Sequence, residues 1–239
     1  MSPGAELLSI VDAAEQALIA GLGLARLQPP PELAHLEGRW KGAPIALDAR
    51  AYRGERTAYA RFVRISAESL AIGNVLCLSR PEHPLPILGV DLVALGGSSV
   101  VAVADLSPVD PLPLAREQQL SALGHRRARA AALSPGGELP AWCTPWFSPH
   151  ALFTRAAPSE LDGVANAVED FWRSYLELDR ASRPDPSGAA AIRELQRAYC
   201  AAHVEHDRGL QLLTKMFEPG LAQRFLREVL FPEGAPPWA

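Results

Sequence analysis

Residues 85–108, LPILGVDLVALGGSSVVAVADLSP, decide the fold of this chain. Two apolar runs rich in valine, leucine and alanine flank the segment GGSS at 96–99, an arrangement typical of a β-hairpin. GGSS lacks the lysine of a phosphate-binding loop, and no helical pattern follows it directly. The stretch therefore predicts two antiparallel strands joined by a short turn.

The hairpin continues a series of similar short runs. The runs APIALDARAYR (43–53), TAYARFVRIS (57–66) and SLAIGNVLCLS (69–79) precede it, separated by glycine, serine and charged residues. Together they predict an antiparallel meander of about five strands between residues 36 and 106. HALFTR, at 150–155, predicts one more strand.

Helical patterns lie on both sides of this region. The predicted helices cover residues 5–24, 114–132, 161–181, 190–217 and 221–231. A sheet from the middle of the chain, covered by helices from both ends, belongs to the α/β class. We expect a three-layer α/β/α sandwich with a central antiparallel sheet, in a single domain spanning residues 1–239.

The composition limits the function classes. The 239 residues carry a formal net charge of −4, which gives no support for nucleic-acid binding. No apolar run approaches the roughly 20 residues that span a bilayer, and the acidic start lacks the basic region of a secretory signal. Cys77, Cys143 and Cys200 are odd in number and widely spaced, which favours a reducing compartment. We expect a cytoplasmic protein without a membrane partner.

Asp91 is the most informative polar position, because it interrupts a very apolar strand. Burial of an unpaired carboxylate is costly and raises its pKa until it holds a proton near neutrality. Such a carboxyl in a pocket is a natural proton donor. The alternative is that Asp91 faces outward or closes a bulge beside Gly89.

The segment HVEHDR, residues 203–208, is the second polar cluster. His203, His206 and Asp207 share one face of a predicted helix. Three interpretations remain open: a metal site that needs further ligands, a solvated helix face, or an acid–base pair that lines a pocket. No HExxH, GxSxG or GxGxxG motif occurs, so zinc peptidases, serine hydrolases and nicotinamide enzymes have no support.

Four segments together resemble the ferredoxin-dependent bilin reductase family. They are the hairpin at 85–108, FSPHALFTR (147–155), YCAAHVEHDR (199–208) and FEPGLAQRFLREVLF (217–231). Their order and spacing agree with the family over roughly residues 70–231. The family fold, an antiparallel sheet between helical layers, matches the pattern described above.

The resemblance implies an enzyme that reduces biliverdin IXα to a phytobilin, either phycocyanobilin or phytochromobilin. In the family, reduced ferredoxin supplies single electrons and side chains supply protons. No cofactor or metal is bound, and the enzyme is usually monomeric. The match places Asp91 on the family's catalytic aspartate, as the central proton donor.

The same match assigns further roles. Asp207 falls on a second acidic position near the bilin, with His206 beside it. Arg155 falls on an arginine that pairs with a bilin propionate, which suits a guanidinium fork. Arg208 is assigned to the other propionate.

One departure concerns the reaction product. The C-terminal segments resemble most closely the phycocyanobilin-forming branch, which pairs its aspartate with a histidine where this chain has Asn74. Asparagine can donate a hydrogen bond but cannot deliver a proton at neutral pH. That branch also has a glutamate on an earlier strand, where this chain has Phe62 or Ser66. The number of electrons used in the reduction therefore stays open.

Three alternatives to biliverdin reduction remain. The first is a bilin-binding carrier protein that does not reduce its pigment, motivated by Asn74. The second is a related reductase of a chlorophyll breakdown product, which shares this fold. The third is a metal-dependent hydrolase built on His203 and His206.

Overall fold

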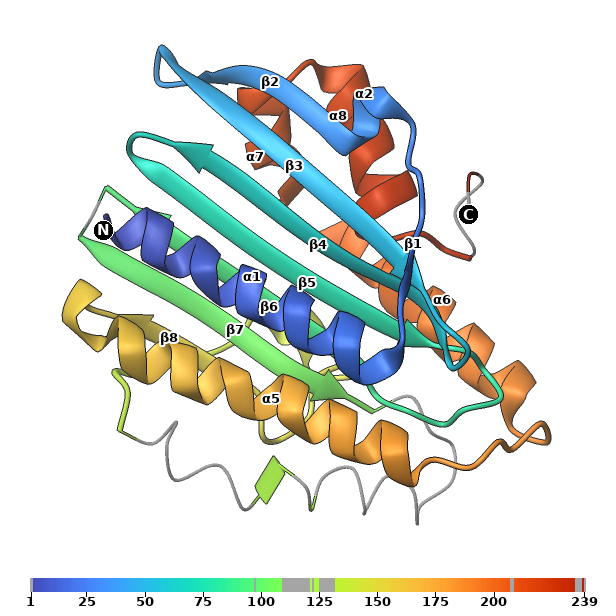
Figure 1. Ribbon diagram of the computed structural model, residues 1–239. Helices are drawn as coiled ribbons and strands as arrows, with labels where there is room; N and C mark the ends of the chain where they lie inside the picture. The colour runs from blue at the N-terminus through green and yellow to red at the C-terminus, as the bar shows by residue number, and fades with distance from the viewer. Residues whose placement is uncertain are drawn as a thin grey trace.

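A computed structural model provides the structure of the chain. It describes residues 2–96, 98–108, 121, 123–124, 132–206, 209–234 and 238. Its centre is a mostly sequential antiparallel sheet (Figure 1). The strands are β1 (Ala25–Arg26), β2 (His35–Trp40), β3 (Ala43–Arg53), β4 (Thr57–Ala67), β5 (Leu70–Ser79), β6 (Ile87–Leu95), β7 (Ser99–Ser107) and β8 (Leu152–Ala156).

The strand order is β1-β3-β4-β5-β6-β7-β8, and β2 pairs with β3 beside β1. Short turns join most of the long strands, and a seven-residue loop, 80–86, joins β5 to β6. Between β2 and β3, Lys41 and Gly42 both adopt positive φ values (50° and 88°), as a two-residue hairpin turn requires. Gly96, which follows β6, also adopts a positive φ value, 57°. Side chains alternate between the two faces of each strand, and this alternation places the site.

Two long helices cover one face of the sheet. The helices α1 (Pro3–Leu22) and α5 (Leu161–Ala181) pack against each other, α1 over β4–β6 and α5 over β6–β8 (Figure 1). Ser2 caps the start of α1 through its hydroxyl, and Gly23 ends it in the left-handed conformation. The buried stripe of α1 meets sheet residues such as Phe62 and Val75, and forms one of two cores.

Shorter helices from the C-terminal part cover the other face. They are α6 (Ala189–His206), α7 (Gly209–Met216), α8 (Pro219–Phe225) and the π-helical turn η3 (Leu226–Leu230); the one-turn α2 (Pro31–Ala34) packs beside α8. Two 3₁₀ turns, η1 (Ala141–Cys143) and η2 (Pro158–Glu160), flank β8. The second core lies between these C-terminal helices and strands β2–β6.

The predicted α/β/α sandwich with its central antiparallel sheet is confirmed. All five predicted strands of the meander and the sixth at 150–155 are present, and the sequence pattern missed only β1 and β2 among the described strands. The helical pattern at 190–217 is found as α6 and α7, and residues 207–208 between them lie outside the described residues. The predicted helix at 114–132 lies largely outside the described residues. No helix within the described ranges is long and apolar enough to cross a membrane.

Candidate active site

A cavity of about 640 Å³ opens on the sheet face opposite α1 and α5. Its floor comes from β4–β8, and its walls come from α6 and the segment around η1. This volume lies within the range of about 300–1,000 Å³ that small-molecule sites occupy. Aromatic side chains form much of the wall: Trp142, Phe147, Phe153, Tyr199 and Phe231.

Asn74 and Asp91 meet at the centre of the floor. They face each other directly across the β5–β6 register, and Asn74 Nδ2 donates a hydrogen bond to Asp91 Oδ1 at 3.2 Å. Both side chains line the cavity. The structure therefore brings together the two residues that the sequence placed on neighbouring strands.

Of the interpretations of Asp91, burial is wrong and the outward-facing one is confirmed. Asp91 is an exposed residue that faces the cavity, while its neighbours Val90 and Leu92 are 4% and 0% exposed beneath the helices on the other face. The apolar character of the strand comes from these neighbours and not from the surroundings of Asp91. The β6–β7 register runs without a break past Gly89, so no bulge forms there either.

Arg61 on β4 is a buried cation at the edge of the floor, only 1% exposed. Its Nε donates to the carbonyl oxygen of Leu230 at 2.6 Å, and its Nη1 donates to Oδ1 of Asn74. The guanidinium carbon lies 5.2 Å from the ring centroid of Phe231. Burial lowers the pKa of Arg61, although an arginine keeps its proton in proteins.

The turn η3 supplies the acceptors for two buried donors. Arg61 binds the carbonyl of Leu230, and Tyr59 Oη donates to the carbonyl of Val229 at 2.9 Å. Carbonyl groups in the last turn of a helix lack partners within the helix and carry its negative dipole end. The C-terminal turn is therefore a ready acceptor for a buried guanidinium.

Phe62 and Ser66, which the sequence offered in place of the family's glutamate, do not line the cavity. Phe62 is 0% exposed in the core under α1. Ser66 follows it at even spacing on β4 and is exposed. The β4 side chain that lines the cavity is Arg61, a cation.

Asp105 on β7 is a buried aspartate of the cavity lining, with 2% exposure. It accepts hydrogen bonds from the Ser148 backbone N–H (2.7 Å), from Ser148 Oγ (2.5 Å) and from Ser107 Oγ (2.9 Å). Desolvation raises the pKa of Asp105, and the hydrogen bonds from Ser148 and Ser107 oppose the rise. The sequence reasoning missed this residue, although Asp-Leu-Ser-Pro at 105–108 and Phe-Ser-Pro at 147–149 contain both partners.

His203 and His206 both line the cavity from α6 but differ in burial. His203 is 6% exposed among aromatic rings, with ring centroids 4.1 Å from Tyr199 and 4.7 Å from Phe231. Its Nδ1 lies 2.9 Å from the Tyr199 carbonyl, so this nitrogen carries the proton of the neutral ring. Desolvation lowers the pKa of His203 to about 4. His206 is exposed at the rim, 5.8 Å from the ring of Trp142.

Arg155 lies at the opposite edge of the floor, on β8. Its side chain is exposed, and its Nε donates to the Gly136 carbonyl at 3.3 Å. Asp207 and Arg208 lie outside the described residues, so the roles assigned to them stay predictions. Within the described part of the chain, no three His, Cys, Asp or Glu side chains form a group that would hold a metal ion.

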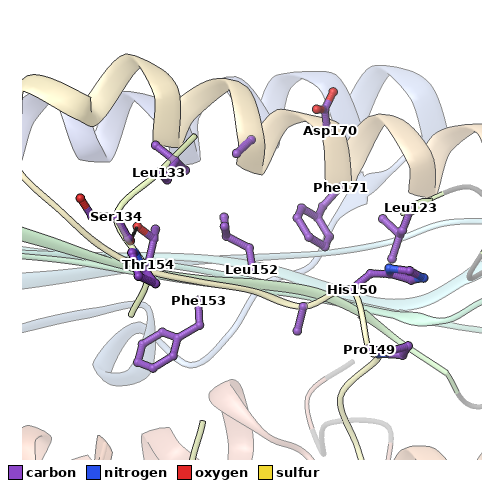
Figure 2. A pocket seen from close by; sticks show the side chains of 13 residues that line it. Leu123, Leu133, Ser134, Pro149, His150, Leu152, Phe153, Thr154, Asp170 and Phe171 are labelled. Carbon is purple, nitrogen blue, oxygen red and sulfur yellow. Dashed lines mark hydrogen bonds between the residues drawn. The ribbon is translucent and has the colours of Figure 1, made fainter. Parts of the chain in front are cut away.

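A second cavity, of about 340 Å³, lies on the other side of the sheet between α5 and β8 (Figure 2). Leu133, Leu152 and Phe171 point into it, with Asp170 and His150 at its margin. Its described lining contains none of Asn74, Asp91, Arg155 and His206. Alternation along β8 explains the division, since Leu152 faces this cavity and Arg155 faces the larger one.

The larger cavity has charged and polar side chains across its floor and aromatic side chains in its walls. Across the floor lie a cation on β4, an amide on β5, carboxylates on β6 and β7, and a second cation on β8. Aromatic walls suit a flat conjugated ligand, and the exposed guanidinium at the edge suits an anionic substituent on it. Asp91 is placed to exchange a proton with such a ligand.

Comparison with known proteins agrees with this chemistry. The family model for ferredoxin-dependent bilin reductases matches residues 11–232. A phycocyanobilin:ferredoxin oxidoreductase of Gloeobacter violaceus is 31% identical over 207 residues, covering 84% of this chain and 80% of the relative. One from Prochlorococcus marinus is 27% identical over 232 residues, covering 94% and 91%.

A similar solved structure is phytochromobilin synthase from tomato in complex with biliverdin. It superposes with a TM-score of 0.82 at 19% identity, covering 94% of this chain and 82% of the synthase chain, which supports the same fold. The family match spans nearly the whole chain and includes every element that lines the larger cavity. The chain belongs to the ferredoxin-dependent bilin reductase family, whose members reduce bilins with electrons from ferredoxin.

Proposed function

We propose that this chain reduces biliverdin IXα to phycocyanobilin or phytochromobilin with single electrons from ferredoxin, without a bound cofactor. The observation that carries the proposal is the Asn74–Asp91 pair at the floor of a cavity with aromatic walls. The relatives named for phycocyanobilin and the tomato synthase solved with biliverdin support the substrate class. Arg155, and Arg208 from outside the described residues, bind the propionates.

Asp91 is the central proton donor of this proposal. Each electron that ferredoxin loses is matched by one proton: the O–H bond of Asp91 breaks as a bond to hydrogen forms on the reduced bilin. Asp91 then regains its proton from solvent. A bilin that covers the exposed carboxyl removes water from it, which favours the protonated form.

The remaining polar residues have supporting roles. Asn74 orients Asp91, since an amide cannot serve as the acid. His206, exposed at the rim, passes protons inward, and Asp207 assists it. If a His206→Ala variant forms the same product at an unchanged rate, this role for His206 falls.

The test is anaerobic turnover of biliverdin IXα with reduced ferredoxin, followed by visible spectra and chromatography of the products. Loss of the biliverdin band with formation of a reduced bilin is the expected result, and the chromatogram names the product. Asp91→Asn should retain binding and stall the reduction. Asp162→Asn, at an exposed position on α5 far from the cavity lining, is the matched control and should turn over normally.

The second candidate function is that of a bilin carrier, favoured by Asn74 in place of an acid. It predicts a stable bound spectrum that electron supply does not change, with ferredoxin shown to be active on a known reductase. The same experiment therefore separates the two functions.

A further inference from the structure

Arg61 is linked to Asp91 by a chain of hydrogen bonds. It donates to the Leu230 carbonyl with Nε and to Asn74 Oδ1 with Nη1, and Asn74 Nδ2 donates to Asp91 at 3.2 Å. The charge of Asp91 also acts on Arg61 through space, and the side-chain hydrogen bond described for Arg61 goes to the Asn74 amide. A buried guanidinium whose side-chain partner is an amide is unusual, because buried charges are normally paired.

The donor and acceptor groups fix which end of the Asn74 amide faces Arg61 and which end faces Asp91. A guanidinium only donates hydrogen bonds, so the end of the Asn74 amide that faces Arg61 must be its oxygen. The NH₂ end must then point across the register to Asp91. Since Nε of Arg61 donates to the Leu230 carbonyl and its guanidinium carbon lies over the ring of Phe231, the Asn74 amide cannot turn over without displacing a buried cation.

We propose that Arg61 is a positioning residue that acts through Asn74 to hold Asp91 as an ionised hydrogen-bond acceptor in the bilin-free pocket. A hydrogen bond donated to a carboxylate favours its charged form, and a nearby cation acts in the same direction. The inference deepens the proposed function. It makes proton uptake by Asp91 follow substrate binding, so the acid is formed only when a bilin is present to receive its proton.

Other groups also act on Asp91, and the test must separate them from Arg61. The charged and titratable residues that line the same cavity are Asp105, Cys143, Arg155, Tyr199, His203 and His206. Desolvation keeps His203 neutral above about pH 5, because its pKa is lowered to about 4. Arg155 keeps a constant charge but lies on β8, two strands from Asp91.

The experiment measures the pKa of Asp91 by NMR of the bilin-free protein labelled with ¹³C-aspartate, assigned with Asp91→Asn. Asn74→Leu should raise this pKa by about one unit, a tenfold change in proton affinity. Arg61→Met should raise it by a similar amount, and by clearly less in the Asn74→Leu background, where only the direct charge of Arg61 on Asp91 is left to lose. Arg155→Met removes a cation from the same cavity without touching Asn74, and should shift the pKa by less than half as much.

Three results overturn the inference: an unchanged Asp91 pKa in Arg61→Met, a fully additive double variant, or an equal shift in Arg155→Met. If Arg61→Met fails to fold, Arg61→Lys replaces it. The lysine side chain ends in a single ammonium group, which cannot donate to the Leu230 carbonyl and to Asn74 as the forked guanidinium does. We therefore expect a smaller rise of the Asp91 pKa in Arg61→Lys. An unchanged Asp91 pKa in this variant refutes the relay, the action of Arg61 on Asp91 through Asn74.

The turnover assay supplies a second readout. The pH at which the Arg61 variants reach half-maximal single-turnover rate should rise with the pKa of Asp91. The NMR measurement needs no bilin, so a wild-type protein that fails to reduce biliverdin refutes the proposed function and leaves the relay standing. Normal reduction with unshifted pKa values refutes the relay alone.

Discussion

His203 offers a direct test of burial at the cavity, through the variant His203→Phe. The histidine is 6% exposed, and desolvation lowers its pKa from 6.5 to about 4. One pKa unit corresponds to about 1.4 kcal/mol, so the full difference corresponds to roughly 3 kcal/mol of unfolding free energy. The phenyl ring keeps the contacts with Tyr199 and Phe231 and removes the titration.

The sign follows from proton binding. As the pH falls below 6.5, the unfolded chain takes up a proton at position 203 that the native protein does not bind. Titration of His203 therefore does not change the wild-type unfolding free energy above pH 6.5, and it lowers that free energy progressively between pH 6.5 and about pH 4. At pH 7 the variant should lie within about 1 kcal/mol of wild type, the usual net value of the hydrogen bond to Tyr199.

Urea unfolding followed by tryptophan fluorescence, at several values between pH 7 and pH 4, measures this difference. His203→Phe should gain roughly 3 kcal/mol relative to wild type at the acid end. His206→Phe on the same helix is the control, because that side chain is 44% exposed and meets water in both states. Parallel profiles for wild type and His203→Phe would show that burial does not hold His203 neutral.

Two further variants test Arg155, at the edge of the cavity floor, and the buried Asp105 on β7. Arg155→Ala should weaken biliverdin binding about tenfold, the value of one charge-assisted hydrogen bond, and should lower the maximal turnover rate by less, as measured by titration and steady-state kinetics. Asp105→Asn should lower the unfolding free energy by about 2 kcal/mol, because its amide turns donors toward the donors of Ser148. Thermal unfolding measures this loss, with Asp162→Asn, at an exposed position, as control. Equal unfolding midpoints for wild type and Asp105→Asn would show that Asp105 does not stabilise the fold.

The sheet was predictable because apolar alternation and turn residues mark each long strand. The runs at 43–53 and 57–66 match β3 and β4 closely. β2 was missed because HLEGRW combines a glycine with three residues that carry or can gain charge, so it lacks the pattern of a half-buried strand.

The candidate site was predictable only in part. The resemblance to the family placed Asn74 on the strand before Asp91, and the register of β5 and β6 shows the two residues directly opposite each other. Arg61 was not predictable, because in TAYARFVRIS it cannot be told from Arg64 three residues later. Arg64 binds Glu15 and Asp12 of α1 on the opposite face, and only the three-dimensional sheet shows which arginine reaches the cavity.

The sequential sheet has a consequence for biosynthesis. From β2 to β7 each strand pairs with the next one along the chain, so these hairpins can close in order as the ribosome releases them. The wall from α6 and the carbonyls that receive Tyr59 and Arg61 come from residues 189–230, which are translated much later. A nascent chain that stops before Val229 lacks both acceptors and leaves the Arg61 guanidinium without its anchor. Among the described elements, the helical turn that anchors Arg61 is therefore translated after every strand of the sheet.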